Sequence, residues 1–361
     1  MSSTTSGLVS DGSSVCDLDI VRVGGKYRLK ERIGAGSFGI VYRGINIVSK
    51  EEIAIKFKSI DADHPQLEHE YKVYKSLAGY TGIPAVRWFG TEGEYNAMVL
   101  ERLGPSLEEL FGRSNRQLSL GMILILVDQM ASIISCLELV HSRHFVHGDV
   151  KPANFLMGLG DHDNQVYLID FGLARMYRDP KTHLHIPYNK NCYPTGTASF
   201  ASINNHLGVE RSRRDDMESL AYILVYLLRG SLPWLGVRPA INMQWLDTTL
   251  QQKMGLPLNL LGSACPNKFK LFLNYTRNLR FDEKPDYAYL RKIFRDLIVR
   301  EGYQSDRPFA RRMISNIPDS RGAGARFKHD KQKVLQGKDT GQSGNKYVPC
   351  LSPLTIYLII L

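Results

Sequence analysis

The chain has 361 residues, and 46 Lys and Arg against 36 Asp and Glu give it a net charge of +10. Hydrophobic residues make up 43% and charged residues 23% of the sequence, a balance that excludes a fibre, a collagen and a wholly disordered chain. A chain of this length usually forms two lobes or two domains rather than one core, and we expect such a division here.

The cysteines and the apolar runs indicate the compartment. The cysteines form no C-x-x-C pair, which argues against a disulfide scaffold or a structural zinc site and is typical of a reducing environment. No charged segment followed by an apolar run opens the chain, and the apolar run 354–361 is far shorter than the ~20 residues of a membrane span. We expect a monomeric, soluble, intracellular protein of the cytoplasm or nucleus. The five cysteines are Cys16, Cys136, Cys192, Cys265 and Cys350.

Composition divides the chain into three segments. Residues 1–24 begin with a stretch rich in Ser, Thr and Gly and are predicted to form a disordered N-terminal arm. Residues 25–303 have a dense globular pattern. Residues 304–361 are rich in Gly, Ser and Lys and hold ten Lys and Arg but only four Asp, which predicts a basic, mostly disordered C-terminal tail.

The globular segment changes character near residue 100. Before it, short apolar runs alternate with Gly or polar turns and predict strands at 27–33, 40–47, 53–57 and 96–100, with one helix at 65–77. Beyond Gly104-Pro105, apolar residues follow helical spacing over 120–140, and residues 217–228 are apolar nearly all round. The predicted fold class is α+β, with a small β-rich lobe over about 25–100 and a larger α-helical lobe over 105–303.

The sequence GAGSFGIV occupies residues 34–41, between two predicted strands. Glycine lets a backbone approach phosphates closely and exposes its N–H donors to them. A plain glycine hairpin is the alternative interpretation, because the G-x-G-x-x-G pattern alone is weak evidence. A dinucleotide-binding Rossmann unit is disfavoured, since the next element is a strand rather than a helix.

Lys56 follows Ala54 and Ile55 in an apolar strand. It is either a solvated lysine of a strand edge or a point charge for the α- and β-phosphates, held by a carboxylate on the following helix. Glu70 is the candidate partner because it shares the inward face with Leu67, and Glu68 is its competitor.

The most specific pattern is HGDVKPAN at 147–154, followed by a predicted strand at 166–169 and DFG at 170–172. Phosphoryl transfer requires an acceptor for the proton of the attacking hydroxyl, oxygen ligands for Mg²⁺ and cations that stabilise the transferring group. Asp149 can be the acceptor, Asn154 and Asp170 the metal ligands and Lys151 the cation. The alternative is an acid-lined turn without chemistry.

These motifs together resemble the eukaryotic protein kinase signature. Over roughly residues 25–303 the chain more narrowly resembles the casein kinase I family of Ser/Thr kinases. The segment ASIN at 201–204 is diagnostic of that family and stands where most kinases have A-P-E. The other matching segments are LGPSLE at 103–108, KPANFLMG at 151–158, TGT at 195–197 and RRDDMESL at 213–220.

The resemblance implies a bilobal protein kinase fold, with ATP and Mg²⁺ as cofactors and acidic Ser/Thr sites in proteins as substrates. It makes Leu100 the residue behind the adenine, residues 101–104 the hinge, Thr197 a contact of Asp149 near the substrate, and Asp216 a buried brace of the catalytic turn. The ATP-binding residues that it implies are Ile33, Gly34, Ala35, Gly36, Ser37, Phe38, Gly39, Ile40, Val41, Ala54, Lys56, Glu70, Leu100, Glu101 and Leu103.

Four positions depart from the family pattern. Gly148 replaces an Arg that helps to order the catalytic loop, and Ala153 replaces an Asp. Ser199 and Asn242 stand where an Arg and a Lys are usual, so two cations that could bind a phosphorylated substrate are missing. The sequence therefore predicts a weakened preference for phospho-primed substrates. A pseudokinase scaffold is the alternative function.

The basic tail suggests a third hypothesis, a nucleic-acid or anionic-surface binder. Aromatic residues are scarce among its Lys and Arg, so stacking on bases is not supported. A solvated, localising or autoinhibitory tail is the favoured interpretation.

Overall fold

A computed structural model describes residues 22–36, 39–61, 66–118, 120–235, 242–255 and 267–300. The chain divides into two compact units, residues 1–316 and 317–361, and all described residues belong to the first. The predicted C-terminal tail and residues 1–21 of the predicted arm lie outside the described residues.

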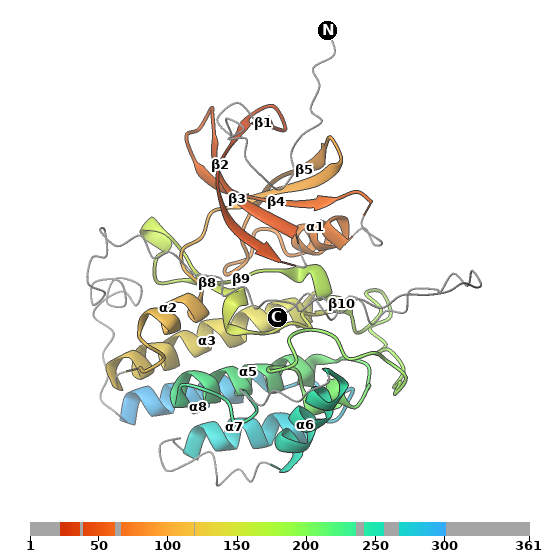
Figure 1. The fold of residues 1–361 in the computed structure, drawn as a ribbon. Helices are drawn as coiled ribbons and strands as arrows, with labels where there is room; N and C mark the ends of the chain where they lie inside the picture. The colour runs from red at the N-terminus through yellow and green to blue at the C-terminus, as the bar shows by residue number, and fades with distance from the viewer. Residues whose placement is uncertain are drawn as a thin grey trace, which may run out of the picture. The chain divides into compact units, whose positions relative to one another are not determined.

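The N-terminal part is one antiparallel sheet of six strands with a helix packed against it (Figure 1). The predicted strands are confirmed, and two further strands, β1 and β5, lie at the sheet edges. The strand β1 lies within the last residues of the predicted disordered arm, where the side chain of Val23 is buried in the core of the sheet. The helix α1 (Gln66–Ser76) agrees with the prediction, although Pro65 lies outside the described residues. The spatial order is β1 (Arg22–Val23), β2 (Tyr27–Gly36), β3 (Gly39–Asn46), β4 (Glu52–Ser59), β6 (Tyr95–Glu101) and β5 (Val86–Glu92).

Alternating side chains give this sheet two different faces. Ile53 and Ile55 of β4 point with Val99 of β6 into a small core of fully buried side chains that Tyr27 and Leu29 complete. Successive strand residues point to opposite faces, so Ala54 and Lys56 point away from that core. The second face, which carries Ala54 and Lys56, is therefore the one that can form the nucleotide site predicted from the sequence.

The C-terminal part is helical, and its long helices surround α5 (Figure 1). The helix α3 extends two residues beyond the predicted 120–140 and packs against α8, while α5 packs against α7. Two short strand pairs lie between the sheet and the helices: β7 (Phe145–Val146) pairs with β10 (Arg175–Met176), and β8 (Phe155–Met157) pairs with β9 (Val166–Leu168). The helices are α2 (Leu107–Arg113), α3 (Leu120–Ser142), α4 (Ile203–His206), α5 (Arg213–Arg229), α6 (Asn242–Gly255), α7 (Asn267–Asn278) and α8 (Tyr287–Arg300).

The helix α5 is buried along almost its whole length, as its continuous apolar run predicts. Its first turn is capped by the Asp215 carboxylate, which accepts a hydrogen bond from Ser212 N at 2.7 Å. Gly230 ends the helix in the left-handed conformation, at φ 87°. A single core joins α5 to α3, α8 and α1, so the two parts are held together by a shared apolar interior.

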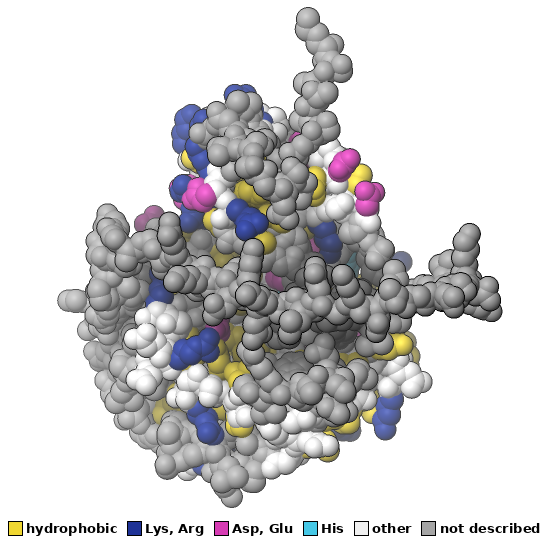
Figure 2. All heavy atoms as spheres, in the orientation of Figure 1, with side chains coloured by type: hydrophobic (Ala, Val, Ile, Leu, Met, Phe, Trp, Pro, Cys, Tyr) yellow, Lys and Arg dark blue, Asp and Glu magenta, His cyan; other side chains and the backbone are white. Residues whose placement is uncertain are grey.

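The architecture confirms the predicted α+β class with a β-rich N-terminal and a helical C-terminal part. Within the described residues, no helix is both long and apolar enough to span a bilayer. On the face drawn in Figure 2, the Lys and Arg side chains of the described residues are dispersed over both parts and form no single basic patch. Cys136 and Cys192, the two described cysteines, are free thiols.

Candidate active site

The second face of the sheet brings four predicted ATP-binding residues together. Val41 pairs with Lys56 across β3 and β4, and Ala54 pairs with Leu100 across β4 and β6. Paired residues of antiparallel strands share a face, so these four side chains form one surface. Val41, Ala54 and Leu100 are half-buried. They form an apolar surface beside the ammonium of Lys56.

The glycine segment has different steric requirements along its length. A side chain on Gly39 would collide with the carbonyl oxygen of Phe57, and its φ of 118° is one that other residues avoid. Gly36 has open space where a side chain would point, so packing within the protein does not require glycine there. The open space beside Gly36 would allow a ligand phosphate to approach the backbone closely. The tip of this segment, Ser37 and Phe38, lies outside the described residues.

The other predicted nucleotide-site residues lie along β2 and β3 and at the end of β6. Gly34 pairs with Val41 and Ala35 pairs with Ile40 in the hairpin of β2 and β3. Ile33 is 50% exposed on β2, and Leu103, just beyond β6, is half-buried. The backbone N–H of Glu101 donates to the carbonyl of Ala85 at 2.8 Å, so it is already bonded within the protein. The N–H of Gly104 donates to Met157 at 2.7 Å and fixes the end of the predicted hinge.

Lys56 joins the sheet to the helix α1 and to the DFG segment. Its amine lies 2.7 Å from Oε2 of Glu70 and 2.9 Å from Oδ1 of Asp170. Of the two glutamates considered from the sequence, the structure selects Glu70. Glu68 points to solvent and pairs with Lys72, one helical turn away. The interpretation of Lys56 as a solvated strand-edge lysine is therefore wrong, because its side chain is buried.

Burial and charge act against each other in this cluster. Burial alone would lower the pKa of Lys56, but the carboxylates of Glu70 and Asp170 raise it well above its ordinary range. Burial raises the pKa of Glu70. Burial also acts to raise the pKa of Asp170, yet the neighbouring ammonium of Lys56 holds it below its ordinary value. The amine and the Asp170 carboxylate are therefore both charged at neutral pH.

Three side chains of α1 position the segment that carries Asp170. The hydroxyl of Tyr74 accepts a hydrogen bond from Asp170 N at 3.1 Å, and Gln66 and His69 bond the carbonyls of Gly172 and Ala174. Asp170 has a φ of 68°, which is uncommon for a residue other than glycine and requires support from its surroundings. The contacts from α1 supply that support.

Asp216 braces the catalytic loop from beneath, as the family resemblance implied. Its carboxylate accepts hydrogen bonds from the backbone N–H groups of His147 at 2.7 Å and Gly148 at 2.8 Å, and it contacts His141 at 2.8 Å. Burial would raise the pKa of Asp216, but these hydrogen bonds lower it. The ring of His147 accepts from Asp149 N and faces the carbonyl of Ile169, which ties the loop to β9 (Val166–Leu168) and the DFG segment.

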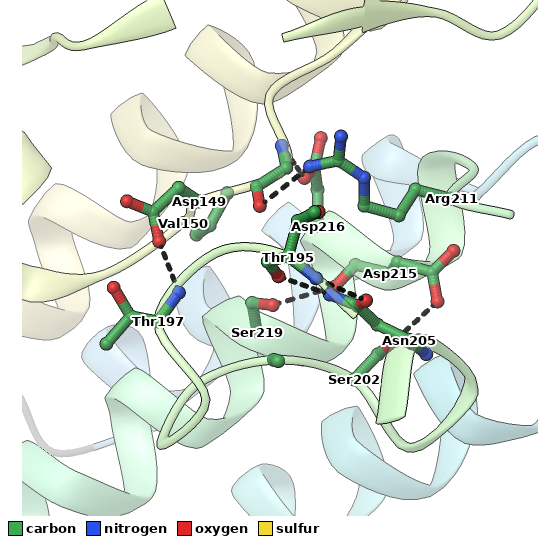
Figure 3. Close-up of a pocket in the computed structure, with 12 residues that line it drawn as sticks. Asp149, Val150, Thr195, Thr197, Ser202, Asn205, Arg211, Asp215, Asp216 and Ser219 are labelled. Carbon is green, nitrogen blue, oxygen red and sulfur yellow. Dashed lines mark hydrogen bonds between the residues drawn. The ribbon is translucent and has the colours of Figure 1, made fainter. Parts of the chain in front are cut away.

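Asp149 lies at the junction of this loop with the segment containing Thr197 (Figure 3). Its Oδ1 accepts from Thr197 N at 2.7 Å, and its Oδ2 lies 2.8 Å from the amine of Lys151. The same amine lies 3.2 Å from the hydroxyl of Thr197. Asn154 donates through Nδ2 to the carbonyl of Asp149 at 2.9 Å, which leaves its amide oxygen as the ligand atom. All four predicted catalytic residues and Thr197 thus meet between the two parts.

The donor set fits a hard divalent cation. Asn154 offers an amide oxygen and Asp170 a carboxylate, and oxygen ligands of this kind suit Mg²⁺. In the part of the chain that the structure describes, no group of three or more His, Cys, Asp or Glu could hold a metal by itself. The other ligands of a Mg²⁺ ion here would therefore come from phosphate oxygens and water.

Sequence reasoning missed several residues of this site. Gln66, His69 and Tyr74 share the inward face of α1, where helical spacing singled out Tyr74 only as a packing residue. Arg211 reaches the catalytic loop from outside every motif, with its guanidinium 3.0 Å from the carbonyl of Gly148. Lys253 of α6 donates to the carbonyls of Ala198 and Ala201, beside Thr197. These last two contacts join residues more than fifty positions apart, which no local pattern could reveal.

The protein kinase domain matches residues 27–277, which is more than half of the chain. The chain belongs to the protein kinase family. The match begins with β2 and ends within α7, so it spans both parts and includes all the site residues described above. The bilobal kinase fold expected from the sequence is confirmed. A protein kinase domain implies a transferase that uses ATP, typically with Mg²⁺, and has proteins as substrates.

Proposed function

We propose that this protein kinase is an active Ser/Thr kinase of the casein kinase I type, and that it phosphorylates acidic protein sites. One observation carries the proposal: the buried amine of Lys56 bridges Glu70 and Asp170. A phosphate-binding lysine held by both carboxylates is the arrangement in which a kinase transfers phosphate. None of the four departures from the family pattern removes a group of this set.

The residues have distinct roles in the proposed reaction. Asp149 orients the hydroxyl of the substrate and accepts its proton as the oxygen attacks the γ-phosphorus and the bond to ADP breaks. Lys151 stabilises the negative charge on the transferring group. Lys56 holds the α- and β-phosphates. Asn154 and Asp170 would hold Mg²⁺, which neutralises charge on the phosphates when bound.

The Ser/Thr assignment is supported by Lys151, two residues after Asp149. Its amine contacts both the Asp149 carboxylate and the Thr197 hydroxyl, so it stands at the position of the incoming hydroxyl. The casein kinase I assignment is supported by the ASIN segment. Ser202 within it caps α4 through Asn205 N and donates to Asp215 at 2.6 Å, which ties this segment to α5.

The weakened preference for phospho-primed substrates is supported by Ser199. Its carbonyl accepts a hydrogen bond from the indole of Trp234 at 2.8 Å, and the residue carries no cation for an anionic side chain. Asn242 begins α6, and its side chain lies outside those described. Without an Arg or Lys at these two positions, charge-assisted hydrogen bonds to a phosphoserine are lost.

A phosphotransfer assay with casein as the acidic substrate tests the main proposal. The purified chain should transfer labelled phosphate from MgATP to Ser and Thr. Asp149→Asn should lower the rate about 10²–10⁴-fold, because the proton acceptor is lost. Asp161→Asn is the matched control and should leave the rate unchanged, because Asp161 is an exposed carboxylate of the short turn Gly160–His162 and none of the site contacts described above involves it. Equal, background-level incorporation by all three proteins would instead indicate a pseudokinase scaffold.

The specificity proposal needs a pair of peptides that differ only by a phosphoserine upstream of the acceptor serine. The ratio of kcat/KM for the primed over the unprimed peptide should be close to one. Ser199→Arg should raise this ratio several-fold by restoring a cation. A strong preference of the unmodified kinase for the primed peptide would contradict the proposal.

A further inference from the structure

Gly148, directly before Asp149, has no room for a side chain. Its φ is 78°, in the left-handed region, and a Cβ atom built on it would coincide with the guanidinium of Arg211. The carbonyl of Leu173 lies 3.1 Å from the same Cβ position. The space beside the catalytic loop is therefore filled by the side chain of a residue that stands sixty-three positions later.

The guanidinium of Arg211 donates to two backbone carbonyls. Nη1 donates to Gly148 O at 3.0 Å and Nη2 donates to Leu173 O at 3.1 Å. Gly148 precedes the proton acceptor, and Leu173 follows the DFG segment. Figure 3 shows Arg211 extending toward the loop that carries Asp149. One rigid planar group thus connects the two loops that carry the catalytic carboxylates.

Arg211 is committed to this bridge. The residue is only 6% exposed, and within the described residues no carboxylate lies within ion-pair distance of its guanidinium. Burial lowers the pKa of Arg211, and the negative charge of Asp216 acts against that shift. Burying a cation that gives its hydrogen bonds to carbonyls rather than to a carboxylate is costly, so the two hydrogen bonds to the loops must offset that cost.

We propose that Arg211 is the positioning residue of this kinase, that it holds Asp149 and Asp170 in register by bridging Gly148 and Leu173, and that Gly148 is required to admit it. The arginine that the family resemblance led us to expect at position 148 is absent. Its space is occupied by a guanidinium that enters from the start of α5 instead. A side chain at position 148 and the guanidinium of Arg211 therefore cannot occupy this space at the same time. This inference rests on the proposed function for its kinetic effects.

The test is a double-mutant cycle of Arg211→Ala, Gly148→Arg and the combined variant in the full-length chain. Arg211→Ala should lower kcat about 10- to 100-fold, because misplacement of catalytic groups by an ångström has effects of this size. The KM for ATP should change less than twofold, since Lys56 and Glu70 are untouched. Gly148→Arg should lower kcat at least as much, because two guanidinium groups compete for one space.

The sign of the coupling distinguishes the proposal from a general loss of stability. Adding Arg211→Ala to the Gly148→Arg protein should raise kcat at least threefold, although the same change is harmful in the unmodified chain. Arg211→Lys retains the charge but presents one donor group instead of a fork and should recover only part of the loss. Arg175→Ala is the matched control, because Arg175 is an exposed arginine that pairs with Glu210, next to Arg211.

Amide hydrogen exchange provides a readout that does not need phosphotransfer. In Arg211→Ala the amides of residues 171–174 and 147–149 should exchange faster, while those of β3 and β4 are unchanged. The proposal is overturned if Arg211→Ala behaves like Arg175→Ala in both kcat and exchange. It is also overturned if the two substitutions are simply additive. If the unmodified chain transfers no phosphate, the proposed function fails, and the exchange pattern still decides the role of Arg211.

Discussion

Two lysines of this kinase are buried in the described residues, and their surroundings give them opposite properties. Lys56, on the sheet, is paired with Glu70 and Asp170. Lys253, on α6, is fully buried and donates to the carbonyls of Ala198 and Ala201 at 2.8 and 2.7 Å. The pKa of Lys56 is raised well above its ordinary range, whereas burial lowers the pKa of Lys253 to about 7.

The difference shows that the partner, rather than the residue type, sets the chemistry of a buried amine. Two carboxylates keep Lys56 charged, which suits a group that binds phosphates. Backbone carbonyls offer Lys253 only partial charges, and the rings of Tyr222 and Trp234, 4.8 and 5.2 Å away, add weak attraction for a cation. In the proposed function Lys56 binds the phosphates of the nucleotide, whereas Lys253 donates to the carbonyls of the turn that follows Thr197.

The largest effect is expected from Lys56→Met. Loss of the phosphate-binding cation should lower kcat/KM about 10²–10³-fold. It also leaves Glu70 and Asp170 buried without their partner, which costs on the order of 3–5 kcal/mol of folding free energy. Adding Glu70→Gln should restore much of the thermal stability but none of the activity. Recovery of activity in the double variant would contradict the proposal that Lys56 is needed as a phosphate-binding cation.

A smaller effect, on the KM for the peptide substrate, is expected from Lys253→Met. The carbonyls of Ala198 and Ala201 lose their donor, and each unsatisfied buried group costs about 1–3 kcal/mol. Steady-state kinetics should show a several-fold higher KM for the peptide with the KM for ATP unchanged. Lys72→Met is the control, because Lys72 is an exposed lysine paired only with Glu68. A change in the KM for ATP alone would contradict the assignment of Lys253 to the substrate side.

The smallest effect is a dependence of stability on pH from His206. Its Nε2 lies 3.1 Å from the amine of Lys253, and burial together with that cation lowers the pKa of His206 to about 4. The folded state therefore binds its proton less readily than the unfolded state, whose pKa is near 6.5. The contribution of His206 to the free energy of unfolding should be fully present above pH 6.5 and should fall as the pH drops toward 4, by at most about 3 kcal/mol. When the free energy of unfolding from urea titrations is plotted against pH, the unmodified chain and His206→Gln should have different slopes over this range. Equal slopes would mean that His206 does not contribute.

Local patterns were sufficient for the parts of the site that lie close together in the chain. The strand before Lys56 and the spacing from Asp149 to Asn154 and Asp170 predicted their roles because neighbouring residues must share one loop or one strand. Helical periodicity favoured Glu70 over Glu68 because it places Glu70 and Leu67 on one face, and the ion pair with Lys56 decided between them. The bounds of the long helices were less predictable, since α3 continues past Val140 to the buried ring of His141, which lies 2.6 Å from the hydroxyl of Tyr287 on α8.

The sequence by itself determined the class of fold and the kinase family, and it singled out Lys56 and the HGDVKPAN segment as site candidates, because each depends on residue types at short, fixed spacings. Only the tertiary structure revealed the contacts on which the proposals for Arg211 and Lys253 rest. Both are basic residues without a motif, and both bond carbonyl groups that folding brings beside them from more than thirty positions away. A backbone carbonyl is present at every residue, so no pattern of side chains can indicate which one a distant cation will bind.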